Sequence, residues 1–166
     1  MIAFPNISPE IFSLTIAGTE YALRWYSVSY LLGFFLAALI MRVFLRRKNL
    51  WRFGTGPLDR DQVDNMLTYL ILGVIVGGRL GYVLFYNLDV YLENPSRIIM
   101  IWDGGMAFHG GFLGVVLATI LYCRFNGILV WSCADLIALA SGPGLLFGRV
   151  ANFVNAELWG RPTDVP

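Results

Sequence analysis

Four long apolar stretches constrain the fold of this chain more than any other feature of its sequence. A helix needs about 20 mostly apolar residues to cross the hydrocarbon core of a bilayer. The candidate stretches are residues 25–45, 63–87, 106–123 and 131–154. Charged residues make up only 14% of the chain, against roughly 25% in a soluble domain. We therefore predict an all-α, polytopic integral membrane protein with about four transmembrane helices.

The sequence divides into an N-terminal arm, a membrane bundle and a short tail. Residues 1–22 mix apolar residues with Pro and Ser, so we expect an amphipathic arm along the outer surface. Residues 23–154 form the predicted four-helix transmembrane bundle, in which Pro143 and its glycine neighbours predict a kink or break. Residues 155–166 form the predicted outer-face tail, which we interpret as the point where a longer transmembrane domain is truncated.

Basic residues predict the orientation of the helices, because Lys and Arg are enriched in cytoplasmic loops. The basic residues around the first connection are Arg42, Arg46, Arg47, Lys48, Arg52 and Arg60. We therefore expect this connection on the cytoplasmic side, together with the turn at 124–129. The N-terminus, the loop at 88–105 and the tail are then expected on the outer side.

Charge and cysteine content argue against several functions. The net charge of +1 gives no basis for nucleic-acid binding. Cys123 and Cys133 lack the spacing of a disulfide framework or a metal site, so we expect no metal. No basic residue precedes Arg24, so we expect no signal peptide. The "HGG" at 109–111 also occurs in oxyanion-hole segments of esterases, but the chain lacks the G-x-S-x-G motif that a serine hydrolase needs.

Three ionisable residues fall inside the predicted spans and at a similar depth. Arg79 lies eight residues before the end of its stretch, which places it about 12 Å below the outer end. Arg149 lies about 8 Å deep by the same measure, and His109 is close to the start of its stretch. Because ionisable residues are costly in hydrocarbon, each is a candidate functional residue. We expect all three in the outer third of the bilayer.

Polar neighbours extend this layer into a candidate site. Tyr82 and Tyr86 share a helical face with Arg79, and Asn152 follows Arg149 by one turn. An outward-opening cavity lined by guanidinium, imidazole, amide and phenol groups fits this pattern. Two arginines in such a cavity favour an anionic ligand, and lipid phosphate is the obvious one at that depth.

Each of these residues also has a structural interpretation. A lone histidine such as His109 is often a hydrogen-bonded residue at a helix crossing, and Arg79 could extend to the lipid head groups. Asp135 could cap a helix or form an ion pair, and Glu157 could be a solvated charge. Glycines four residues apart allow close helix packing, and they are Gly73, Gly77, Gly81, Gly110, Gly114, Gly144 and Gly148. The convergence of the ionisable residues on one layer favours function.

Three motifs, in order, resemble the bacterial prolipoprotein diacylglyceryl transferase family. They are "GGRLGYVLFYN" (77–87), "WDGGMAFHGGFLG" (102–114) and "GRVANFVNAELWGRPT" (148–163), and the first span resembles the family as well. The resemblance implies a multi-pass enzyme of the bacterial inner membrane with its active site toward the outer leaflet. It implies transfer of diacylglyceryl from phosphatidylglycerol to the lipobox cysteine of a prolipoprotein signal peptide. It implies no cofactor.

The resemblance also implies roles for individual residues. His109, Arg149 and Asn152 match essential family residues, and Tyr26 matches an important tyrosine of the first helix. We interpret His109 as the general base and Arg149 as the phosphate ligand, with Asn152 and Tyr26 orienting the head group. Arg79 is expected to be a second phosphate contact or a structural ion partner. The remaining matches are Glu157 and Gly160, in the third motif, and an acidic position at Asp135.

Two other functions fit the membrane pattern less well. A small transporter or channel would also carry intramembrane charges and a broken helix, but here the charges are predicted in one layer rather than along a path. A structural membrane subunit would need only the packing glycines. Family members continue with further helices and another essential arginine, so we expect the 166-residue chain to be incomplete as an enzyme.

Overall fold

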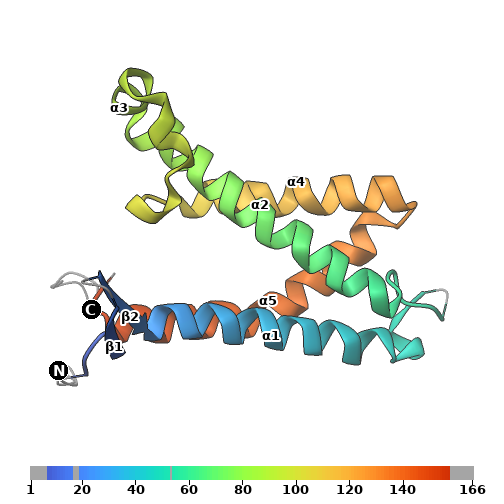
Figure 1. Cartoon of the computed structure of the whole chain (residues 1–166). Helices are drawn as coiled ribbons and strands as arrows, with labels where there is room; N and C mark the ends of the chain where they lie inside the picture. Colours follow the sequence, from blue (N-terminus) through green and yellow to red (C-terminus); the bar gives the residue numbers. More distant parts are fainter. Residues whose placement is uncertain (1–6, 17–18, 53, 158–166) are drawn as a thin grey trace, which may run out of the picture. The chain divides into compact units, whose positions relative to one another are not determined.

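The computed structural model describes residues 7–16, 19–52 and 54–157, and it is mostly helical (Figure 1). Its long helices are α1 (Trp25–Leu45), α2 (Arg60–Tyr86), α4 (Phe108–Asn126) and α5 (Val130–Val154). All four are long and apolar enough to cross a bilayer, which confirms the predicted all-α membrane fold. The short elements are η1 (Lys48–Leu50), α3 (Leu88–Glu93), η2 (Pro95–Ile99) and η3 (Ile101–Asp103).

The ends of the helices follow from local signals outside the apolar stretches. α2 begins at Arg60, before the predicted start, because a capping box forms: the Asp59 N–H donates to Gln62 Oε1 at 2.8 Å. α4 ends at Asn126, where Gly127 adopts a left-handed conformation with φ 65° and donates its N–H to the Cys123 carbonyl. Local capping therefore extends the start of α2 and the end of α4 beyond the predicted spans.

Pro143 does not break α5, which runs continuously from Val130 to Val154. Proline removes one backbone donor and clashes with the preceding turn. Transmembrane helices tolerate this loss when neighbouring groups satisfy the freed carbonyl. The predicted break is therefore wrong, and the alternative of a kink at Pro143 stays a prediction.

The chain forms two compact units. One unit combines the residues up to Ile40 with those from Ile137 onward, and the other spans Met41–Leu136. The first unit thus holds the N-terminal part of α1 and most of α5. The second holds α2, α3 and α4.

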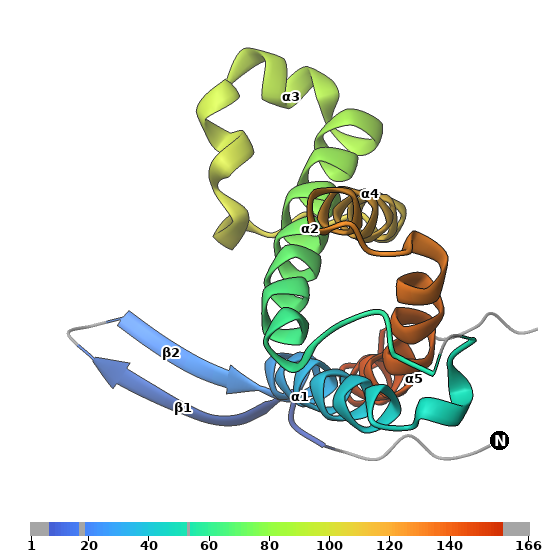
Figure 2. The same cartoon turned by 90° about the vertical axis from the view of Figure 1, so that its right-hand side faces the viewer.

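The first unit contains a β-hairpin that the all-α expectation did not include. Strands β1 (Glu10–Ile16) and β2 (Thr19–Arg24) pair antiparallel, with Glu10 opposite Arg24 (Figure 2). The side chains of this terminal pair form an ion pair at 3.3 Å. The predicted arm at 1–22 overlaps this hairpin, and residues 1–6 and 17–18 lie outside the described residues. The sequence carried a signal for it, since two alternating runs flank the dipeptide Ala17-Gly18.

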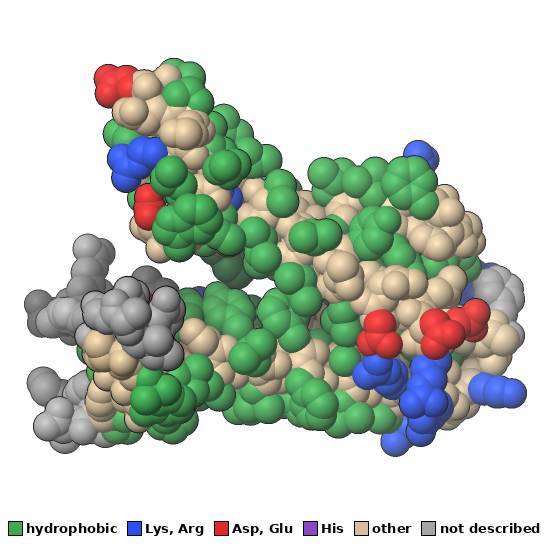
Figure 3. Space-filling model, in the orientation of Figure 1, with side chains coloured by type: hydrophobic (Ala, Val, Ile, Leu, Met, Phe, Trp, Pro, Cys, Tyr) green, Lys and Arg blue, Asp and Glu red, His purple; other side chains and the backbone are tan. Residues whose placement is uncertain are grey.

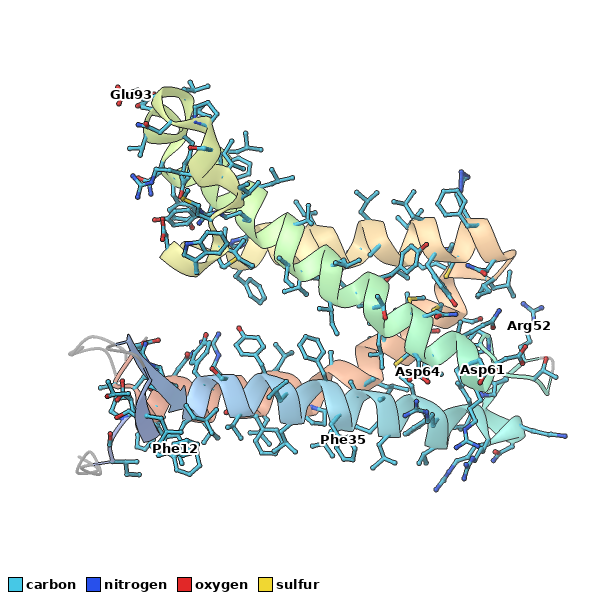
Figure 4. The ribbon with its side chains drawn as sticks, in the orientation of Figure 1. Phe12, Phe35, Arg52, Asp61, Asp64 and Glu93 are labelled. Carbon is cyan, nitrogen blue, oxygen red and sulfur yellow. The ribbon has the colours of Figure 1, made fainter. Side chains whose placement is uncertain are left out.

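In the same unit, α1 and α5 approach each other through glycine. A Cβ atom on Gly33 would lie 3.0 Å from the Cα of Gly144, so the two backbones are close at this point. Large side chains such as Phe35 on α1 and Phe12 on the hairpin are exposed (Figure 4). Exposed apolar side chains of this kind suit contact with lipid.

In the second unit, α2 and α4 cross with their backbones in contact (Figure 1). A Cβ atom on Gly73 would lie 2.6 Å from the Gly114 carbonyl oxygen, and one on Gly81 would lie 2.7 Å from the Gly110 Cα. Gly77 lies between them and faces Gly110 and Gly114. The predicted role in helix packing is confirmed for these glycines, and Gly144 faces Gly33 in the other unit. The prediction is wrong for Gly148, because nothing lies within 4 Å of a Cβ atom at that position.

Basic side chains gather at the connection between α1 and α2, while hydrophobic side chains cover much of the helices on the same face (Figure 3). Arg42, near the end of α1, forms an ion pair with Asp64 in α2. Asp61 lies in the first turn of α2, one turn before Asp64 (Figure 4). This cluster is the one from which the sequence predicts a cytoplasmic connection, and the orientation stays a prediction.

Replacing Gly77 with alanine is expected to destabilise the α2–α4 pair. The added methyl group would overlap backbone atoms of Gly110, which cannot move aside as a side chain could. Overpacking of this kind costs about 1–3 kcal/mol. We expect the thermal unfolding midpoint of the detergent-purified protein to fall by several degrees.

Gly142→Ala is the matched control, because nothing lies within 4 Å of a Cβ at this position of α5. Alanine is the better helix former there, so the midpoint should stay the same or rise slightly. An unchanged midpoint in Gly77→Ala would contradict the proposed backbone contact.

Candidate active site

Arg79 is held by backbone carbonyls on every side of its guanidinium group. The residue lies in α2 and is only 4% exposed. A guanidinium has five N–H donors, and the structure gives five acceptors for them. The acceptors are the carbonyls of Ile98 (2.9 Å from Nε), Gly104 and Gly105 (Nη1, the second at 3.2 Å), and Arg97 and Met100 (Nη2, 2.6 and 2.9 Å). The ring of Tyr91 adds a cation–π contact, with its centroid 5.2 Å from the guanidinium carbon.

The segment that Arg79 holds leads directly into the helix that carries His109. Two residues after Gly105, the Ala107 N–H donates to the carbonyl of Gly78 at 2.9 Å. α4 begins at the next residue, so His109 lies in its first turn. The backbone at His109 is therefore fixed against α2 by contacts of two adjacent residues, Gly78 and Arg79.

The His109 side chain itself is exposed. Its ring contacts Phe108 edge-on, with centroids 5.8 Å apart and an interplanar angle of 82°. Within the part of the chain that the structure describes, its imidazole nitrogens form no hydrogen bond. The structural interpretation of a lone histidine requires such a bond, so this geometry favours a role in which a ligand engages the ring.

Tyrosines lie beside the segment that Arg79 holds. Tyr82 and Tyr86 stack with centroids 5.6 Å apart, on the same helix as Arg79. The Tyr82 hydroxyl accepts a hydrogen bond from Asn87 Nδ2 at 2.7 Å, and its ring packs against Gly105. Gly105 has φ 83°, a left-handed conformation that suits glycine at this close approach.

The first unit brings together a second group of the predicted residues. Tyr26, in the first turn of α1, lies close enough to Arg149 and Glu157 to interact electrostatically with both. Its ring also lies 5.2 Å from that of Tyr30. Arg149 is exposed, and within residues 7–16, 19–52 and 54–157 it forms no ion pair.

Asn152 differs from its neighbours because it is buried. It is 8% exposed, and its Oδ1 has no hydrogen-bond donor among the described residues. The Oδ1 atom of Asn155 is also buried and has no donor among the described residues, while its Nδ2 donates to Glu157 Oε1 at 3.4 Å. A buried acceptor without a donor is unfavourable, so both amides lie ready for a donor supplied from outside the described chain.

A cavity of about 330 Å³ adjoins this second group. Its lining residues are Ser8, Pro9, Glu10, Arg24, Asn155 and Glu157. Sequence reasoning identified Glu157 but missed Glu10 and Arg24, because these two become neighbours only through the hairpin. The alternating pattern of the two strands was the signal that could have found them.

The predicted site residues thus fall into two groups that are described separately. Arg79 and His109 belong to the second unit, and Tyr26, Arg149, Asn152 and Glu157 belong to the first. Asp135 is exposed and forms no ion pair within the described segments. Gly160 lies outside the described residues. A common depth for Arg79, His109 and Arg149 stays a prediction.

A family model described as prolipoprotein diacylglyceryl transferase matches residues 12–166. The chain belongs to this family. Membership confirms the resemblance that rests on the three motifs. Together with the four apolar helices, it makes the chain a multi-pass membrane protein.

Curated relatives agree with the family match. The chain is 52% identical over 166 residues to the phosphatidylglycerol–prolipoprotein diacylglyceryl transferase of Ruegeria pomeroyi, covering 100% of this chain and 56% of the relative. It is 50% identical over 165 residues to that of Cereibacter sphaeroides, covering 99% and 81%. It is 46% identical over 166 residues to that of Rhizobium meliloti, covering 100% and 58%. The chain spans little more than half the length of the first and third of these relatives.

The exposed imidazole of His109 should react with diethyl pyrocarbonate, which modifies accessible, unprotonated histidines. We expect the peptide that contains His109 to be modified at a rate similar to that of an oligohistidine tag on the same protein. Mass spectrometry of digests from the detergent-purified protein measures both rates. A His109 peptide that stays unmodified while the tag reacts would contradict the exposure seen here.

Proposed function

We propose that this protein, at its full length, transfers the diacylglyceryl group of phosphatidylglycerol to the lipobox cysteine of a prolipoprotein signal peptide. The names of the relatives support phosphatidylglycerol and a prolipoprotein as the substrates. The lipobox cysteine as acceptor rests on the family resemblance of the three motifs. The observation that carries the proposal is the state of His109 and Arg149. The reaction needs a base and a group that binds the phosphate. Both side chains are exposed, and among the described residues they form no ion pair or hydrogen bond.

The proposed reaction is a displacement at carbon 3 of the glyceryl group. A thiol is only a few per cent ionised at neutral pH, so His109 accepts the thiol proton as sulfur attacks. The new bond joins sulfur to this carbon, and the bond from the carbon to the phosphate oxygen breaks. Glycerol phosphate leaves with the electron pair of the broken bond, and the proton held by His109 can pass to the leaving phosphate.

The remaining residues act on the lipid head group in this proposal. The phosphate gains negative charge as it leaves, and the Arg149 guanidinium stabilises this charge in a medium of low dielectric constant. The Oδ1 of Asn152 lacks a donor, and a hydroxyl of the glycerol head group can supply one. Tyr26, which interacts electrostatically with both Arg149 and Glu157, helps to orient the head group together with Glu157. Gly160 is proposed as a further contact on the basis of its motif.

The proposal places the protein in the bacterial inner membrane, with the site toward the outer leaflet. The basic cluster between α1 and α2 supports a cytoplasmic position for that connection. The N-terminus and the segment before α4 then face outward, where prolipoprotein cysteines and outer-leaflet lipid are available.

The central test compares variants of the full-length protein with radiolabelled phosphatidylglycerol and a lipobox peptide. His109→Gln should lower the rate of thioether formation at least about 100-fold, because general bases contribute 10²–10⁴-fold. Arg149→Met should lower it about 10²–10³-fold, because a charge-stabilising donor is lost. Arg124→Met is the matched control, since it removes an exposed arginine at the far end of α4 and should leave the rate unchanged.

Near-normal transfer by His109→Gln would overturn its role as the base. A wild-type protein that moves a solute across vesicles but lipidates no peptide would indicate a transporter instead. Intact lipidation in Arg149→Met with weakened assembly would indicate a structural subunit.

Asn152→Leu separates binding from folding. Leucine is nearly isosteric with asparagine, and it removes a buried acceptor that has no donor. We therefore expect the thermal midpoint to stay the same or rise. Transfer activity should fall at least about tenfold, which corresponds to the loss of one hydrogen bond of about 1.4 kcal/mol in the transition state. A lower midpoint with unchanged activity would show that Asn152 is purely structural.

A further inference from the structure

We propose that Arg79 is a positioning residue: its guanidinium orders residues 97–105 and thereby places His109 at the start of α4. The effect on activity rests on the proposed function of His109. The effect on the ordering of the segment does not, because it follows from the hydrogen bonds of Arg79 alone.

Arg79 uses every donor of its guanidinium group. Nε, Nη1 and Nη2 carry five N–H groups in a fixed planar fork. The five carbonyls around them leave none of these donors for a phosphate. A phosphate contact would require Arg79 to give up bonds that are already made in a buried position.

Among the described residues, three of the five carbonyls have no donor other than Arg79. Arg97 and Ile98 lie at the end of the short helix η2, and Met100 follows it. The Arg97 and Met100 carbonyls also accept backbone N–H bonds, from Met100 at 3.2 Å and from Asp103 at 3.3 Å. The carbonyls of Ile98, Gly104 and Gly105 have Arg79 as their donor among the described residues. A cation beside the last carbonyls of a helix is favourable. Gly104 and Gly105 adopt φ angles of 80° and 83°, so this part of the segment has little local preference for its conformation. One side chain therefore satisfies carbonyls from both ends of the segment.

The segment that Arg79 bonds is directly connected to His109. Only Met106 separates Gly105 from Ala107, whose N–H bonds the Gly78 carbonyl on α2. His109 follows in the first turn of α4, and its neighbour Gly110 packs against Gly81. Loss of the Arg79 bonds frees the segment on the N-terminal side of His109, while the α2–α4 contact on the other side remains. A misplacement of about 1 Å in a reacting group can cost 10²-fold in rate.

Lysine distinguishes this role from a contact made through charge. Arg79→Lys keeps the positive charge but offers donors from a single nitrogen, which cannot reach carbonyls on both sides of the fork. Positioning predicts that Arg79→Lys and Arg79→Met both lower kcat at least about tenfold, with the KM for phosphatidylglycerol nearly unchanged. A phosphate contact predicts that Arg79→Lys keeps most of its activity and that Arg79→Met raises the KM.

A glycine variant tests the same segment without changing Arg79. Gly104→Ala forces a side chain into a left-handed conformation, although nothing lies within 4 Å of the new Cβ atom. It should shift the carbonyl that Arg79 bonds and lower kcat in the same way, to a smaller extent. Gly54→Ala is the matched control, because Gly54 has φ 69° and open space but lies in the α1–α2 connection.

The experiment uses the full-length protein in detergent and combines transfer kinetics with amide hydrogen exchange. In both Arg79 variants, peptides from 97–107 should exchange faster than in the wild type, and peptides from the α5 region should not. Diethyl pyrocarbonate should modify His109 at a changed rate. Ile99→Val alters an exposed side chain in the same segment, at a residue whose carbonyl Arg79 does not bond, and should change none of these readouts.

The outcomes separate this proposal from the proposed function. Unchanged exchange at 97–107 in Arg79→Met, or full kcat in Arg79→Lys, would overturn the positioning role while leaving the transferase reaction intact. A wild-type protein without transfer activity would overturn the proposed function. In that case faster exchange and altered His109 modification in the variants would still support Arg79 as the organiser of the segment.

Discussion

In the hydrocarbon core of a bilayer there is no water to satisfy a backbone or side-chain polar group, and this constraint underlies the whole structure. It forces the spans into helices, because a helix pairs its own N–H and C=O groups. It also removes the hydrophobic force between helices, so association depends on close packing. α2 and α4 meet this condition through Gly73, Gly77 and Gly81 on one side and Gly110 and Gly114 on the other. The same constraint explains why Arg79 is surrounded by carbonyls.

The polar groups of this chain are of two kinds: those that have a hydrogen-bond partner within the chain and those that have none among the described residues. Arg79 has a partner for every donor. Among the described residues, His109 has no hydrogen bond, Arg149 has no ion pair, and the Oδ1 of Asn152 has no donor. An unsatisfied polar group in or near a membrane is unfavourable. We propose that the satisfied arginine is part of the scaffold and that the unsatisfied groups are the ones available to a substrate.

Sequence reasoning succeeded where one residue type has one physical consequence. Long apolar stretches predict spanning helices because composition alone decides membrane insertion, and glycines at four-residue spacing predict close packing because only their backbones can touch. The motifs led to the correct family. Reasoning failed for features that depend on distant residues. The hydrogen-bond partners of Arg79 could not be predicted from the sequence, because they are backbone carbonyls, which every residue has. The hairpin was overlooked although its two alternating runs signalled it. The cavity beside it was missed because Glu10 and Arg24 become neighbours only through the hairpin.

The order in which the chain is synthesised affects when the five carbonyls can bond Arg79. Its carbonyl partners follow Arg79 by 18 to 26 residues. During synthesis, this arginine therefore leaves the ribosome before any of the groups that solvate it in the folded protein. As a solitary helix in lipid, α2 would carry this cation without its carbonyl partners, which is costly unless the side chain extends to the head groups. The full set of hydrogen bonds around Arg79 can form only after the segment that leads to His109 has followed it.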